Sequence, residues 1–115
     1  MPNINNIQSQ IRKGVLEYCI LSVMKDKRAY ASDIIQELKK AKLIVVEGTL
    51  YPLLTRMKKA DLLSYEWEES SQGPPRKYYF LTPTGETFQN ELKEYWEELV
   101  KSVDLLTNTK SIDTI

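Results

Sequence analysis

The spacing of apolar residues changes twice along this 115-residue chain, and this change constrains the fold more than any other feature. Up to about residue 60, apolar residues recur every three or four positions, which is typical of amphipathic helices. From Leu62 to Leu81 they alternate with polar residues, as in half-buried strands. From Pro83 onward the helical spacing returns. We therefore expect an α+β chain, mainly α with one small antiparallel β-hairpin before a long last helix.

Three helices are predicted before the hairpin. The first begins near the N-terminus and includes Gly14, which is expected to mark close packing because glycine is otherwise costly in a helix. The second covers "YASDIIQELKKA", with Ser32 as a candidate N-cap. The apolar segment "KLIVV" then leads into the third helix and is expected to lie against the core.

The third helix covers "EGTLYPLLTRMKK". Because Pro52 is tolerated in a first turn, where its missing N–H has no partner in any case, the helix is expected to begin near Glu47 or Gly48. One face is apolar, and the other carries hydroxyl groups and cations, namely Thr49, Thr55, Arg56, Lys58 and Lys59. Such a face suits a helix that reads a DNA groove, and it equally describes a solvated cationic helix.

The hairpin is predicted to join "LSYEW" and "RKYYFLT" through the turn residues "SSQGPP". Arg76 and Lys77 then stand just after a stiff Gly-Pro-Pro tip. The aromatic residues that follow are expected to anchor the hairpin to the helices, because a lone hairpin is marginal in water. The basic pair either contacts a phosphate backbone or simply covers the strand edge.

The last helix is predicted to start at Pro83 or Thr84, with Thr84 as a candidate N-cap. Its apolar residues fall at near-heptad steps, namely Phe88, Leu92, Tyr95, Leu99, Val103 and Leu106. Little of the chain remains to cover this stripe, so a partner helix is expected to cover it. The predicted division is 1–82 as a DNA-binding winged helix-turn-helix, 83–108 as a dimerisation helix, and 109–115 as a disordered tail.

The net charge is zero, but it is divided unevenly between the two halves of the chain. Residues 1–60 carry eleven Lys and Arg against five Asp and Glu, and residues 61–115 carry five against eleven. This separation suits a chain that turns one face to a polyanion and keeps another away from it. Chance and solvated helix faces would produce the same pattern.

Composition argues against catalysis. Histidine is absent, which removes the commonest general base and metal ligand. We find no Gly-rich phosphate loop, metal-ligand spacing or nucleophile–base pair, so no enzyme activity, cofactor or metal is expected. The single Cys19 lies among apolar residues and is predicted to be a buried thiol. Without a membrane span or secretory signal in the sequence, we expect a cytoplasmic protein with no membrane partner.

Two short helices before a hairpin, the second of them cationic on its free face, describe a helix-turn-helix with a wing. In that arrangement the third helix would read bases in the major groove through Thr49, Thr55 or Arg56. The wing would contact phosphates, which supply affinity and position. Tyr51 is either a core residue whose hydroxyl reaches out or a phosphate contact.

Two motifs carry a family resemblance. "GTLYPLLTRMKKADLL" followed by "GPPRKYYFLTPTG" resembles the PadR family of winged-helix transcriptional regulators, and the pair is more specific than either motif alone. The resemblance extends from about Lys13 to Trp96. Ala31 stands where the family often has Gly, and Ala60-Asp61 replaces its usual acidic residue and Gly.

The resemblance implies a homodimer that binds a palindromic operator on double-stranded DNA, usually as a repressor. The first and last helices would hold the dimer. The predicted dimerisation residues are therefore Ile7 and Ile11 of the first helix, together with the apolar stripe of the last helix. The single last helix is similar to the smaller subfamily, some of whose members bind flat aromatic molecules between paired tryptophans. Trp96 occupies that place here and would contact an aromatic effector, or else it packs in the dimer.

The full predicted set of DNA-contacting residues is Ser32, Thr49, Tyr51, Thr55, Arg56, Lys58, Lys59, Arg76 and Lys77. A different class of function, a winged-helix module that binds only protein, fits the same fold. The cations of the third helix and the wing argue against it, because protein interfaces are depleted in Lys.

Overall fold

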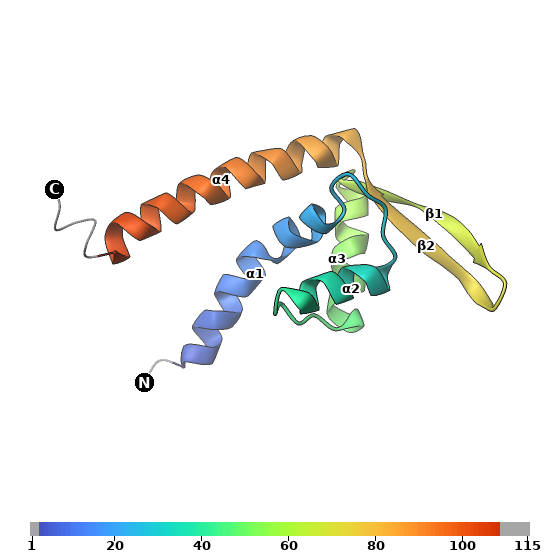
Figure 1. Cartoon of the computed structure of the whole chain (residues 1–115), viewed down its shortest axis with the longest axis horizontal. Helices are drawn as coiled ribbons and strands as arrows, with labels where there is room; N and C mark the ends of the chain where they lie inside the picture. The colour runs from blue at the N-terminus through green and yellow to red at the C-terminus, as the bar shows by residue number, and fades with distance from the viewer. Residues whose placement is uncertain (1–2, 109–115) are drawn as a thin grey trace.

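The computed structural model describes residues 3–108, which form four helices and one hairpin (Figure 1). This confirms the predicted class, mainly α with a small antiparallel hairpin. The predicted tail 109–115 lies outside the described residues. The elements in chain order are α1 Ile4–Val23, α2 Ala31–Lys40, α3 Glu47–Lys59, β1 Leu63–Ser70, β2 Gly73–Leu81 and α4 Pro83–Thr107.

The core lies where the C-terminal end of α1 meets α2, α3 and the base of the hairpin. Its fully buried large side chains come from all of these elements, namely Ile20, Leu21, Met24, Ile34, Leu50, Leu54, Met57 and Leu63. The segment between α2 and α3 contributes Val45 to the core, whereas Ile44 and Val46 point outward. The prediction that this segment lies against the core is therefore only partly right.

The N-cap of α2 differs from the predicted one. The helix begins at Ala31 with Tyr30 as its N-cap, and the Asp33 carboxylate accepts a hydrogen bond from the Tyr30 backbone N–H at 3.0 Å. Ser32 therefore lies inside the first turn and is exposed, so it does not cap the helix. An Asp three residues after the cap satisfies a backbone donor that would otherwise have no partner.

The start of α3 at Glu47 is as predicted, but Pro52 lies deeper in the helix than the first turn. Pro52 is the sixth helical residue, so its missing N–H leaves the Gly48 carbonyl without the usual helical donor. Gly14 of α1 also differs from the prediction. A methyl group there would meet nothing within 4 Å, so this glycine does not mark close packing within the chain.

The hairpin is longer than predicted, and its turn is tighter. β1 runs to Ser70 and pairs there with Gly73, so only Ser71 and Gln72 form the turn. The Gly-Pro-Pro sequence therefore belongs to β2 and is not the tip. A two-stranded sheet has a free edge on each side, so prolines in it need not interrupt a ladder. The register is irregular between Glu68 and Ser70, next to these prolines.

A backbone junction joins the end of β2 to the start of β1. The Thr82 hydroxyl donates to the Asp61 carbonyl at 2.6 Å and accepts from the Gly85 N–H at 2.9 Å. The Thr82 N–H donates to the Leu62 carbonyl at 3.2 Å. Thr82, rather than the predicted Thr84, is thus the N-cap of α4, and Pro83 is its first residue. The backbone of Asp61 lies in the left-handed region, at φ 62°. The family that the sequence resembles usually has Gly at this position.

A polar network attaches the start of α4 to the end of α1. The Lys25 ammonium donates to Asn90 Oδ1 at 2.6 Å and to Gln89 Oε1 at 3.2 Å. Gln89 is buried, and its amide donates to the Ser22 hydroxyl at 3.2 Å. Leu92 packs half-buried against the core next to this network. Beyond Leu92, α4 extends away from the hairpin (Figure 1).

Cys19 packs half-buried against the core. Burial raises the pKa of its thiol, so the thiol stays protonated at neutral pH. The prediction of a buried thiol is therefore only partly right, because the side chain is half-buried. No helix among residues 3–108 is long and apolar enough to span a membrane.

Gly85→Ala is expected to destabilise the fold strongly. A Cβ at this position would overlap the Leu62 carbonyl oxygen, and two backbones would have to separate. We expect a loss of about 3 kcal/mol in the free energy of unfolding. Gly14→Ala is the matched control, since its surroundings are open, and it should gain about 0.5–1 kcal/mol. Urea unfolding at one fixed protein concentration measures both, and equal effects would contradict the junction's role.

Candidate nucleic-acid interface

The outward surface of α3 has three parts. Thr55 and Lys59 lie in its middle, with Pro52 on the N-terminal side of Thr55 and Arg56 at one side of the same shallow surface. Lys58 turns toward the wing, which we define as the β1–β2 hairpin, and its ammonium lies 5.4 Å from the Tyr65 ring centroid. The predicted contacts of α3 are all exposed, but they do not form a single row.

Arg56 and Thr49 face α1 rather than the middle of the α3 surface. The Arg56 guanidinium forms an ion pair with the Glu17 carboxylate of α1. Thr49 shares a hollow with Lys13, Leu16 and the same Glu17. About two thirds of the Arg56 side chain remains exposed (65%), so this ion pair is of the surface kind and contributes little to stability. Arg56 is therefore accessible but already has a partner.

Each cation of the wing rests on aromatic rings. The Arg76 guanidinium lies 4.0 Å from the ring centroid of Tyr30. The Lys77 ammonium lies 4.5 Å from the Tyr65 ring and 5.3 Å from the Trp67 ring. Cations over aromatic faces are held by the ring quadrupole. Both predicted wing cations therefore lie against aromatic rings.

The base of the wing is fixed to the helical body. The backbones of Ala29 and Tyr79 exchange two hydrogen bonds, of 2.9 and 2.8 Å, which form an isolated β-bridge beside β2. Arg28 donates to the Glu66 carboxylate at 2.7 Å and lies over the Phe80 ring at 4.5 Å. Tyr79 is buried, and burial raises the pKa of its hydroxyl. These contacts agree with the predicted anchoring role of the aromatic residues.

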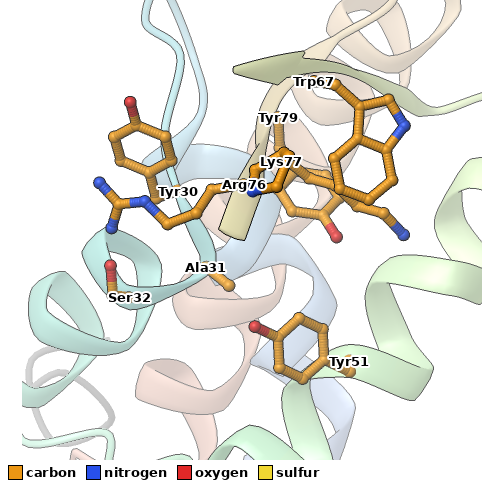
Figure 2. A pocket seen from close by; sticks show the side chains of 9 residues that line it. Tyr30, Ala31, Ser32, Tyr51, Trp67, Arg76, Lys77 and Tyr79 are labelled. Carbon is orange, nitrogen blue, oxygen red and sulfur yellow. The ribbon is translucent and has the colours of Figure 1, made fainter. Parts of the chain in front are cut away.

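A cleft of about 270 Å³ opens between the wing, the start of α2 and α3 (Figure 2). We call it the wing cleft. In Figure 2, Arg76 extends toward Tyr30 and Ser32 on one side, Trp67 forms the other side, and Tyr51 lies below. The residues that line it are Tyr30, Ala31, Ser32, Tyr51, Trp67, Pro75, Arg76, Lys77 and Tyr79.

The wing cleft brings together four predicted contacts from three separate parts of the sequence, namely Ser32, Tyr51, Arg76 and Lys77. Two hydroxyl groups and two cations around one hollow can bind an anion such as a phosphate. Tyr30 and Trp67 are two of the lining residues that were not predicted as contacts. Their only signal in the sequence is aromatic character, which is equally typical of a core residue.

The residues predicted for dimerisation lie away from this surface, on α1 and α4. Ile7 and Ile11 are 46% and 63% exposed, and Leu99 is 38% exposed. Trp96, which was predicted to contact an aromatic effector, is 39% exposed on the same helix as Leu99. Phe88, Tyr95, Val103 and Leu106 are exposed as well, whereas Leu92 packs against the chain's own core. So many exposed apolar side chains on two helices are unusual for a monomer.

Comparison with known proteins identifies the family. Residues 20–93 match the model of the "Transcriptional regulator PadR-like family", which is more than half of the chain. The chain belongs to the PadR-like family of transcriptional regulators. The family resemblance inferred from the two motifs is thereby confirmed. Members of this family are transcription regulators rather than enzymes, in agreement with the expectation of no catalytic activity.

Solved structures of PadR-like proteins share the fold. A PadR-like transcription factor from Bacteroides fragilis is 64% identical, with a TM-score of 0.76 over 89% of this chain and 99% of that one. A PadR family regulator from Eggerthella lenta is 29% identical, with a TM-score of 0.81 over 90% of each chain. A PadR-like regulator from Bacillus cereus is 39% identical, with a TM-score of 0.76 over 84% of this chain and 95% of that one.

Proposed function

We propose that this PadR-like regulator is a homodimeric repressor that binds a palindromic operator through α3 and the wing. The observation that carries the proposal is the wing cleft, where hydroxyl groups and cations from α2, α3 and β2 converge beside the exposed surface of α3. A cationic, hydroxyl-lined surface is what binding to a phosphate backbone requires. Because its target is DNA, we also propose that the protein works in the cytoplasm.

The two parts of this surface would have different tasks. Thr55 and Lys59, in the middle of the α3 surface, would meet base edges in the major groove, with Thr49 and Arg56 at its α1 side. Arg76, Lys77, Ser32 and Tyr51 around the wing cleft would contact phosphates and fix the orientation. Lys58, turned toward the wing, belongs with this second group.

We propose that the dimer forms through α1 and α4. The supporting observation is the apolar face that both helices leave exposed, including Ile7, Ile11, Leu99 and Val103. In this proposal residues 1–82 bind DNA and residues 83–108 hold two copies together. A two-fold dimer presents two copies of α3, which would explain a palindromic operator.

An aromatic effector is a further part of the proposal. Trp96 lies on the exposed side of α4, between Leu92 and Leu99, where a partner helix would bring a second Trp96 near it. Two indole rings can hold a flat aromatic molecule between them. A ligand at this place would change the angle between the two DNA-binding units and release the operator.

Selection of binding sites from a random duplex pool tests the function directly. The selected site should be two-fold symmetric, and its affinity should fall steeply as salt rises. No enrichment, with only weak association insensitive to salt, would favour the alternative of a winged-helix module that binds protein. Lys77 at the wing cleft argues against that alternative, because protein interfaces are depleted in Lys.

Replacing both Arg76 and Lys77 with Ala should weaken binding to every DNA sequence. Their phosphate contacts carry no sequence information, so the salt slope should flatten by about one to two phosphate equivalents while the preferred site stays the same. Titration of the selected duplex at several salt concentrations measures both quantities. Lys93→Ala with Lys101→Ala is the control, since it removes two cations from α4. An unchanged slope in the wing variant would contradict the wing assignment.

Glu17→Gln should strengthen DNA binding. The substitution removes the ion pair that holds Arg56 against α1 and leaves the guanidinium free for DNA. We expect a gain of about two- to fivefold, as for an exposed ion pair worth up to about 1 kcal/mol. Glu37→Gln is the control, because it removes the same charge and frees Lys40 at the end of α2. Equal gains from both variants would mean that only net charge changed and that Arg56 does not contact DNA.

Leu99→Glu should dissociate the dimer. The substitution places an unpaired carboxylate in the proposed interface, at a cost of about 3 kcal/mol or roughly a hundredfold in the dissociation constant. Leu105→Glu is the control, because Leu105 is exposed and lies outside the heptad stripe. Sedimentation over a range of concentrations distinguishes the variants. A Leu99→Glu protein that stays as dimeric as the control would place the interface elsewhere.

A further inference from the structure

Tyr30 lies where the helical body meets the wing, and its position in the body is fixed. It is the N-cap of α2, and its backbone N–H donates to the Asp33 carboxylate at 3.0 Å. The preceding residue, Ala29, pairs with the backbone of Tyr79 in β2. The backbone that carries the Tyr30 ring is therefore attached to both α2 and β2.

The ring itself is also held in place. Its centroid lies 4.7 Å from that of Tyr78, with the two planes tilted by 30°. Its hydroxyl donates to the Glu68 carboxylate of β1, which raises the pKa of Tyr30. Glu68 stands opposite Arg76 in the hairpin register. Tyr30 thus contacts both strands of the wing close to Arg76.

Arg76 lies with its guanidinium 4.0 Å from the centre of this ring, at the edge of the wing cleft (Figure 2). Stacking uses the flat face of a guanidinium and leaves its N–H groups free to donate. An arginine whose side chain is already held in place loses less side-chain entropy when it binds a phosphate.

We propose that Tyr30 is a positioning residue, which holds Arg76 at the wing cleft so that its N–H groups meet one phosphate of the bound duplex. This inference rests on the proposed DNA-binding function. Lys77 differs in one respect. Its rings, Tyr65 and Trp67, belong to the wing itself, so they do not fix it relative to α2 and α3. The contact between Tyr30 and Arg76 therefore fixes the position of a wing cation relative to the helical body.

A double-mutant cycle on the selected duplex tests the inference. Arg76→Ala should flatten the salt slope by about 0.9, the value for one phosphate. Tyr30→Leu should weaken binding about two- to fivefold, as expected for an exposed cation–π contact, and should flatten the slope in the same direction. In the Arg76→Ala background Tyr30→Leu should change nothing further. Tyr30→Phe keeps the ring and should retain the wild-type slope.

Two results of the cycle would overturn the inference. The first is a loss on Tyr30→Leu that is equally large with and without Arg76, because Tyr30 would then act on its own. The second is a Tyr30→Leu slope equal to that of the wild type. Thermal unfolding of each variant, together with binding measured well below its midpoint, separates these results from simple loss of the fold.

A measurement on the protein without DNA separates this inference from the proposed function. In an NMR spectrum of the arginine side chains, the ring current of Tyr30 should shift the Arg76 Nε–H signal upfield. Tyr30→Leu should abolish the shift, and Tyr30→Phe should keep it. An unshifted signal in the wild type would overturn the positioning role. A shifted signal in a protein that binds no duplex would overturn the DNA-binding function and, with it, the phosphate as the partner of Arg76.

Discussion

The close contact between the start of α4 and the start of β1 is the constraint on which the rest of the structure depends. Gly85 lies so near the Leu62 carbonyl that no side chain fits between them. Thr82 bonds to the Asp61 and Leu62 carbonyls through its side chain and backbone. The end of α3, both strands and the first turn of α4 therefore meet at one place. A small change there would alter the direction of α4 relative to α3.

This junction links the two surfaces that the proposed function needs. On one side it sets the wing beside α3, so that the wing cleft forms. On the other side it directs α4 along α1, where Lys25, Gln89 and Asn90 secure the first turns of the helix. In a dimer held by α4, the spacing and angle of the two α3 helices would follow from this one joint. An effector near Trp96 would act on the same geometry from the other end of the helix.

The charged residues are also divided between the proposed DNA-facing surface and α4. The basic half of the chain supplies α3, and the wing adds Arg76 and Lys77, whereas α4 carries much of the acidic excess of the second half. An acidic α4 is repelled by DNA, so it favours the orientation in which α3 and the wing face the duplex. The aromatic rings beneath the wing cations add order to this charge, because they hold Arg76 and Lys77 before any partner arrives.

The periodicity of the sequence was sufficient to predict the element order and the strand alternation, because these follow from local spacing of apolar residues. The start of α3 at Glu47 was predicted from Pro52, although Pro52 lies beyond the first turn. Details that depend on competing local signals were predicted less well. The prolines at 74 and 75 suggested a turn, but the free edges of a two-stranded sheet accept them. Ser32 and Thr84 are good capping residues by type, but Tyr30 and Thr82 hold the capping positions.

The sequence by itself therefore determined which residues are helical, which alternate in strands and which carry charge, because these properties depend on neighbours in the chain. Only the tertiary structure decided that Arg56 pairs with Glu17, that Ser32, Tyr51, Arg76 and Lys77 surround one cleft, and that Tyr30 holds Arg76. Those relations depend on how α1, α2, α3 and the wing pack together. That packing is fixed by long-range contacts, such as the one between Leu62 and Gly85, which leave no periodic trace in the sequence.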